Sequence, residues 1–113
     1  MKLAIIGSRN LTQLVIDEYI PDGVTEIVSG GASGVDTLAK EFAKRKGIKL
    51  TEFLPQYNLY GRCAPIKRNE KIAQYADEAI ALWDGKSKGT ECTIILFKKH
   101  GKKVTVIIKS DLN

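Results

Sequence analysis

The sequence has little of what marks membrane, secreted or metal-binding proteins. No apolar run approaches the roughly 18 residues of a membrane span, and the first seven residues are too short for a signal peptide. Cys63 and Cys92 are too few for a disulfide framework, and a single histidine does not favour a metal site. We therefore expect a cytoplasmic protein with no metal, no required cofactor and no membrane partner.

The composition is that of one globular domain. The chain has 113 residues, of which 43% are hydrophobic and 27% are charged, so it can fill one core and is not expected to be disordered. It contains no repeat, linker or low-complexity stretch, so residues 1–113 are treated as one domain. The net charge of +5 suits an anionic partner, although a modest lysine excess is also typical of a solvated surface.

Short β-branched runs alternate with segments of helical period along the chain. The runs predict strands at residues 3–6, 25–28, 48–54, 79–83 and 104–108. Helices are predicted over about 10–20, 36–47, 65–76 and 90–101, with a long loop at 56–64. This alternation predicts an α/β fold, a single Rossmann-like three-layer αβα domain whose mainly parallel five-stranded sheet has the order 3-2-1-4-5. A flavodoxin-like strand order is the alternative.

The first predicted helix rests on one cap and one apolar face. Asn10 can cap it, and Leu11, Leu14, Val15 and Tyr19 have the i, i+3, i+4, i+8 spacing of a buried stripe. The turn residues at 21–23 would end it. Trp83, at the end of the fourth predicted strand, is expected in the core.

The glycines are distributed unevenly between the two edges of the predicted sheet. Ligands of open parallel sheets bind outside the carboxyl ends of the strands. Loops at those ends hold seven of the ten glycines, which are Gly7, Gly30, Gly31, Gly34, Gly61, Gly85 and Gly89. Because glycine lets a phosphate approach the backbone N–H groups, this edge is predicted to face the ligand.

Two glycine-containing loops are the strongest indications of a phosphate-binding site. Residues 29–36 follow a buried strand and open a helix, which offers N–H donors and the Ser33 hydroxyl to a phosphate. The alternative is a tight turn in which Asp36 is a plain helix cap. Residues 86–90 have the same character, and their alternative is a lysine-rich turn capped by Thr90.

Three polar side chains are predicted near these loops. Arg9 can grip a phosphate or can pair with Asp36 or Asp84. Asn69 points to the apolar side of its helix, so it needs a partner, either a ligand or a neighbouring loop backbone. Arg68 is beside it and can reach the same cleft. Tyr60, in the long loop, can stack on a base or fill a small core.

These residues together resemble the SLOG superfamily, which includes LOG-type (lysine decarboxylase-like) phosphoribohydrolases and the Rossmann domain of the DNA-processing protein A. The small YspA/YpsA-like branch is the most similar. The matching residues cover nearly the whole chain and are 7–9, 29–36, 38–39, 60–61, 64, 68–69, 77 and 84–90. The resemblance implies a Rossmann-like domain that binds a nucleotide or a nucleotide-derived ligand, and relatives that commonly form dimers.

One departure from the family concerns catalysis. LOG-type enzymes have a Pro-Gly-Gly-x-Gly-Thr-x-x-Glu motif whose glutamate works with an arginine on the preceding helix. Gly89 and Thr90 match and Arg68 is near the arginine position, but the glutamate position holds Thr93. Glu91 is two residues away, which turns a helical side chain by about 200°. Because N-glycoside cleavage needs a carboxylate, we favour binding over hydrolysis.

The sequence thus predicts a nucleotide-binding module, acting as a sensor or carrier. The alternatives are a phosphoribohydrolase-like N-glycosidase, with Arg68, Asp84 and Glu91 as catalytic candidates, and, third, single-stranded DNA binding. A homodimer is expected. The predicted ligand-binding residues are Gly7, Ser8, Arg9, Gly30, Gly31, Ala32, Ser33, Gly34, Asp36, Tyr60, Arg68, Asn69, Asp84, Ser87, Gly89 and Thr90.

Overall fold

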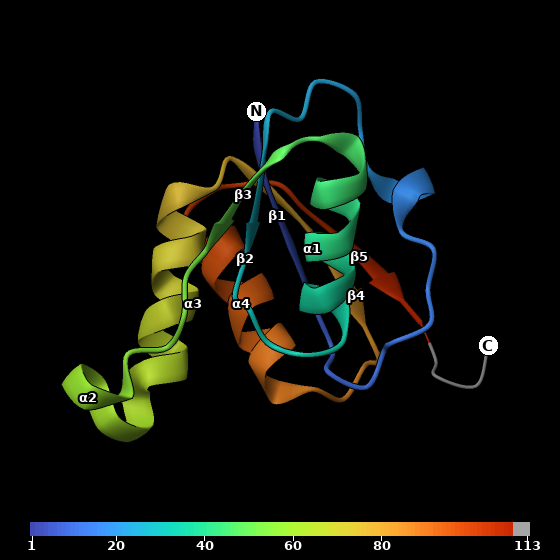
Figure 1. The fold of residues 1–113 in the computed structure, drawn as a ribbon. Coiled ribbons are helices and arrows are strands. Elements are labelled where there is room, and N and C mark those ends of the chain that lie inside the picture. Colours follow the sequence, from blue (N-terminus) through green and yellow to red (C-terminus); the bar gives the residue numbers. More distant parts are fainter. Residues whose placement is uncertain (110–113) are drawn as a thin grey trace.

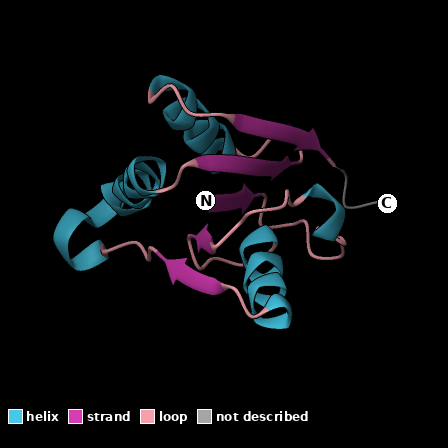
Figure 2. Cartoon of the chain, turned by 90° about the horizontal axis from the view of Figure 1, so that it is seen from above, coloured by secondary structure: helices cyan, strands magenta, loops and turns pink. Residues whose placement is uncertain are grey.

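Five parallel strands form a sheet that helices cover on both faces (Figures 1 and 2). The computed structural model describes residues 1–109. The strands are β1 (Lys2–Gly7), β2 (Glu26–Ser29), β3 (Lys49–Glu52), β4 (Glu78–Trp83) and β5 (Val104–Ile108). Their order is β3-β2-β1-β4-β5 and every neighbouring pair is parallel, which confirms the predicted α/β architecture over the flavodoxin-like alternative.

Four α-helices and two 3-10 turns connect the strands. The helices are α1 (Val35–Lys46), α2 (Tyr57–Tyr60), α3 (Ala64–Tyr75) and α4 (Lys88–Lys99), and the 3-10 turns are η1 (Asp17–Tyr19) and η2 (Gly61–Cys63). Figure 1 shows α3 and α4 on one face of the sheet and α1 on the other. Within residues 1–109, no helix is long and apolar enough to cross a membrane, and no cluster of potential metal ligands is found.

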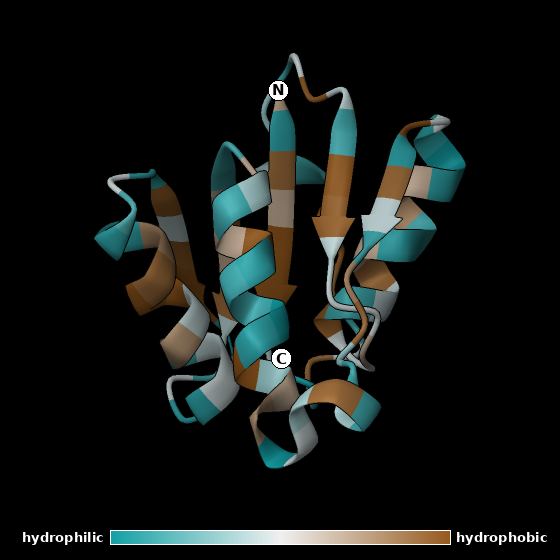
Figure 3. Cartoon of the chain, turned by 90° about the vertical axis from the view of Figure 1, so that its left-hand side faces the viewer, coloured by the Kyte–Doolittle hydropathy of each residue, from teal (hydrophilic) through white to brown (hydrophobic). Residues whose placement is uncertain are grey.

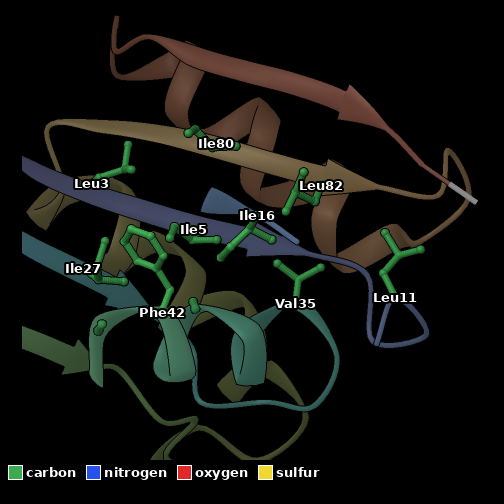
Figure 4. Close-up of a cluster of buried hydrophobic side chains, with 11 residues drawn as sticks. Leu3, Ile5, Leu11, Ile16, Ile27, Val35, Phe42, Ile80 and Leu82 are labelled. Carbon is green, nitrogen blue, oxygen red and sulfur yellow. The ribbon is translucent and has the colours of Figure 1, made fainter. Parts of the chain in front are cut away.

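The alternation of side chains along the strands builds two cores. Leu3 and Ile5 of β1 point to the α1 face, where they pack with Phe42 (Figure 4). Ala4 and Ile6 point to the other face, which α3 and α4 cover. Since successive strand residues point to opposite faces, a strand buried on both faces is apolar throughout. The central strands β1 and β4 are accordingly mostly apolar, whereas the edge strand β3 has Leu50 as its one apolar residue. Figure 3 shows the brown, hydrophobic stretches of the central strands.

The first predicted helix is wrong. The chain from β1 to β2 is an irregular strap that contains only η1, and the apolar residues that it buries are Leu11 and Ile16. Figure 4 shows both side chains beside the α1 core, whereas Val15 is 76% exposed. The segment is rich in β-branched residues, which lose side-chain freedom in a helix. The apolar spacing of the segment fits a helix. In the structure, an irregular strap covers the α1 side of the sheet instead, with Leu11 and Ile16 inserted into the core.

The other differences are local. β3 ends at Glu52, before the predicted end, and the predicted loop at 56–64 contains α2 and η2. α4 begins at Lys88, two residues earlier than predicted. Trp83 is half-buried rather than central to the core, and its indole N–H donates to the Ser87 carbonyl at 3.0 Å.

Candidate functional site

A cleft of about 430 Å³ opens at the carboxyl ends of β1, β2 and β4. This is the sheet edge where the glycine-rich loops lie. Most of the sequence-predicted residues line this main cleft, namely Gly7, Ser8, Arg9, Gly30, Ala32, Asp36, Arg68, Asn69, Asp84, Ser87, Gly89 and Thr90. The fold therefore brings residues from four separate segments of the chain around one hollow.

The remaining predicted residues lie elsewhere. Gly31 and Ser33 line a second hollow of about 240 Å³, the side hollow, which adjoins the main cleft. Gly34 lines neither and packs under the strap. Tyr60 and Glu91 are exposed and also line neither hollow, so the structure does not place them at this site.

Ser8 ties together the loops that form the main cleft. Its side chain is buried, and its Oγ accepts the Asp84 N–H at 3.0 Å. Its carbonyl accepts the N–H groups of Leu11 in the strap and Val35 at the start of α1, both at 3.3 Å. Its own N–H donates to the Leu82 carbonyl at 3.1 Å. One residue thus fixes the strap, the start of α1 and the β4–α4 loop relative to one another.

Gly34 allows the close approach of α1 to the strap. Its φ of +72° lies in the left-handed region, and a Cβ there would be 2.4 Å from the Arg9 carbonyl oxygen. Only glycine meets both conditions without strain. Gly34, rather than Asp36, is the N-cap residue of α1, so the alternative in which Asp36 is a plain helix cap is wrong.

Arg68 links α3 to the loop after β2. Its guanidinium is buried and donates from Nη1 to the Gly30 carbonyl at 2.6 Å and from Nε to the Asn69 Oδ1 at 2.9 Å. Burial lowers the pKa of the Arg68 guanidinium below its ordinary value. The partner of Asn69 is therefore the neighbouring arginine, which is neither of the two partners considered from the sequence.

Asp36 brings a carboxylate to the same wall. Its Oδ2 accepts the Ala32 N–H at 3.0 Å, and this bond closes the loop before α1. Burial raises the pKa of Asp36, although the Ala32 N–H and the charges of Arg68 and Arg9 act in the opposite direction. A carboxyl group with a raised pKa inside a cleft is a candidate for proton transfer.

Asp84 organises the entrance to α4. Its Oδ1 accepts the N–H groups of Lys86 and Ser87, both at 2.8 Å, and these bonds hold the pKa of Asp84 at about 2. α4 starts after Ser87, so Thr90 is a buried residue of the first turn and not the cap. Within the described chain, the N–H groups of residues 88–90 have no hydrogen-bond acceptor. They form the positive end of the helix dipole at the wall of the cleft.

Arg9 is an exposed cation of the main cleft, as is Lys88. No ion pair or side-chain hydrogen bond joins Arg9 to any residue in the described part of the chain, so it is not paired with Asp36 or Asp84. The cations that line the cleft are Arg9, Arg68 and Lys88 and the carboxylates are Asp36 and Asp84, three against two. The excess of one positive charge suits a small anion.

Sequence reasoning missed several lining residues. Asn10 was assigned to a helix cap, and it lines the cleft because the strap is irregular. Ile6, Pro65 and Ile72 add apolar surface, although the sequence placed Ile6 only in a strand and the other two only in a helix. Thr93 occupies the position where the SLOG resemblance expects a glutamate, and its hydroxyl donates to the Gly89 carbonyl at 3.0 Å.

Comparison of the chain with family models, curated proteins and solved structures finds no match. The interpretation of the cleft therefore rests on its own geometry and chemistry.

Proposed function

We propose that the protein binds a small phosphorylated, nucleotide-like ligand in the main cleft and acts as a sensor or carrier of it. One observation carries the proposal: unused donors converge on a single hollow. The N–H groups of residues 88–90 have no acceptor within the described chain, and Arg9 has no acidic partner there. Helix N-termini and arginine side chains are the groups that proteins use to hold phosphate.

The lining divides into parts that suit the parts of a nucleotide. Arg9, Arg68 and the first turn of α4 neutralise and hold the phosphate. Ile6, Pro65 and Ile72 provide apolar surface for a base or sugar. The carboxylate of Asp84, one of the predicted ligand-binding residues, already accepts two N–H groups. It therefore serves to shape the loop before α4.

The decisive variant pair is Gly89→Asp and Gly89→Asn. An added Cβ at Gly89 meets nothing within 4 Å, and an acidic residue in the first turn suits the helix dipole, so both variants should fold. The two side chains have nearly the same size, but only aspartate is charged. Two like charges about 5 Å apart repel by about 3 kcal/mol at an effective dielectric constant of about 20. We expect Gly89→Asp to bind at least tenfold more weakly than Gly89→Asn.

Calorimetry with adenosine and uridine mono- and diphosphates measures this difference. Arg62→Ala, which removes an exposed arginine outside the cleft, is the control and should bind like the wild type. Absence of binding by the wild type, or equal affinity of the two Gly89 variants, would contradict the proposal.

A second candidate function is cleavage of a nucleotide at its N-glycosidic bond. The position of Asp36 supports this function. Asp36 lines the cleft, and burial raises the pKa of its carboxyl group, as a general acid requires. The Thr93 hydroxyl cannot replace the expected carboxylate, and Glu91 is exposed outside the cleft. Incubation with purine and pyrimidine nucleoside monophosphates, followed by chromatography for free base, tests this candidate. No base release by the wild type, or equal release by Asp36→Asn, would eliminate this role.

We also propose that the protein is a cytoplasmic homodimer formed through α3 and α4. These helices lie side by side and expose Ile66 and Ile95, which are 50% and 56% exposed. Light scattering coupled to size exclusion should give the mass of a dimer for the wild type and of a monomer for Ile95→Glu. Val15→Glu, which changes an exposed residue of the strap, is the control and should stay dimeric. A monomeric wild type would contradict the dimer.

A further inference from the structure

The main cleft and the side hollow share one wall. Arg9, Gly30, Ala32 and Arg68 line both of them. The side hollow adds Gly31, Ser33 and Pro55, which belong to the loops after β2 and β3. The two arginines therefore lie between two hollows and not at the blind end of one.

This arrangement has a consequence for the shape of the ligand. A phosphate held by Arg9 and Arg68 has space on both sides. A nucleoside monophosphate fills only the main cleft and leaves the side hollow to water. At roughly 30 Å³ per water molecule, the 240 Å³ of the side hollow hold about eight waters, which is room for a group the size of a sugar ring.

The lining of the side hollow suits a polar group. Besides the wall shared with the main cleft, it contains the backbone at Gly31, the exposed side chain of Ser33 and the ring of Pro55. The Gly31 N–H already donates to the Ser29 Oγ, and the Gly30 carbonyl already accepts from Arg68. The Ser33 hydroxyl has no hydrogen bond within the described residues, and it can both donate to and accept from a sugar hydroxyl. A further phosphate is less suited, because Arg9 and Arg68 are the only cations among the lining residues.

We propose that the ligand is a nucleotide whose phosphate or pyrophosphate carries a second, sugar-like group, with the nucleoside in the main cleft and the second group in the side hollow. This inference rests on the proposed nucleotide binding. It names a narrower class: diesters of phosphate or pyrophosphate with a polar group on each side.

The test compares ligands that differ only in the second group. Titration calorimetry is run with adenosine diphosphate against adenosine diphosphate glucose, and with the matching uridine pair. The sugar nucleotide has one negative charge fewer, because its terminal phosphate is esterified, so charge alone favours the diphosphate. We expect the sugar nucleotide of at least one pair to bind at least tenfold more tightly.

Two variants locate this gain. Pro55→Trp places a bulky ring at the side hollow, and Pro55→Ala makes the same backbone change without the bulk. We expect Pro55→Trp to abolish the preference for the sugar nucleotide and leave diphosphate affinity within twofold, whereas Pro55→Ala keeps the preference. If the diphosphates bind but neither sugar nucleotide binds more tightly, or if the preference survives in Pro55→Trp, the inference fails and the proposed function stands. If no nucleotide binds, the proposed function fails as well.

Discussion

Replacing Ser8 by alanine tests whether one residue holds the loops of the cleft together. The Ser8 side chain is 1% exposed, and its Oγ accepts the Asp84 N–H at 3.0 Å. The substitution removes one oxygen and leaves that N–H without its acceptor. A buried donor left in this state costs about 1–3 kcal/mol. Because Asp84 is half-exposed and water can reach it, we expect the lower part of that range, about 1–2 kcal/mol.

Thermal unfolding followed by circular dichroism measures this loss. At about 4 °C for each kcal/mol in a domain of this size, the midpoint should fall by about 4–8 °C. Ser33→Ala is the control, since Ser33 is exposed and its hydroxyl has no hydrogen bond within the described chain. The control should stay within about 0.5 kcal/mol of the wild type. If Ser8→Ala unfolds at the wild-type midpoint, or if both variants lose the same amount, the linking role of Ser8 is wrong.

Three further predictions concern the frame of the site and the opposite edge of the sheet. Gly34→Ala should lose at least about 2 kcal/mol in urea unfolding, because it combines a left-handed φ with a contact to the Arg9 carbonyl. Lys102→Met should lose about 1–2 kcal/mol, because the Lys102 ammonium donates to three carbonyls at the end of α3 at 2.7–2.8 Å. For Asp36, folding favours the protonated carboxyl, so its stabilisation is complete below its ordinary pKa of 3.8 and is lost as the pH rises through the raised value. The stability of the wild type relative to Asp36→Asn should therefore be lower at pH 7 than at pH 4.

Matched control substitutions separate these specific effects from a general loss of stability on mutation. Gly47 has a φ of +65° but open space around it, so Gly47→Ala should lose only about 1 kcal/mol. Lys103 is exposed, and Lys103→Met should be nearly neutral. Equal losses at positions 34 and 47 would refute the close contact, and equal losses at 102 and 103 would refute the carbonyl contacts. If the wild type gains stability relative to Asp36→Asn between pH 4 and pH 7, the predicted direction of the pH dependence is wrong.

The alternation of strands and helices and the sheet edge that holds the cleft followed from periodicity, whereas the sequence left the order of the strands open between two arrangements. Strand residues such as Leu3 and Ala4 face opposite sides, and helix residues such as Ala39 and Phe42 recur at helical spacing, so both patterns are visible in the sequence. The carboxyl ends of parallel strands then meet at one edge whatever the loops contain. The position of Gly89 at the cleft could therefore be predicted from its place in the loop after the fourth strand.

The strap could not be predicted by the same reasoning. Leu11 and Ile16 anchor it by tertiary contacts with the α1 core, and these override an apolar spacing that also fits a helix. The partner of Asn69 was missed because adjacent helical residues do not face each other, whereas the long Arg68 side chain bends back to bond its neighbour. Tyr60 was placed at the site by its loop, but loop membership does not fix the direction of a side chain.

The hydrogen bonds divide the cleft into a frame and a ligand-facing part. Ser8, Asn69 and Asp84 bond to other protein groups and hold the loops in place. Arg68 belongs to both parts, because its Nε and Nη1 bond to the protein while the residue also lines the cleft. The first turn of α4 keeps donors that no described residue uses. A change in the frame should therefore reduce stability and ligand affinity together. A charge introduced at Gly89 should instead reduce affinity at nearly constant stability, because its Cβ meets open space. Only a cleft built to receive an anion predicts this separation, since a purely structural turn would have no affinity to lose.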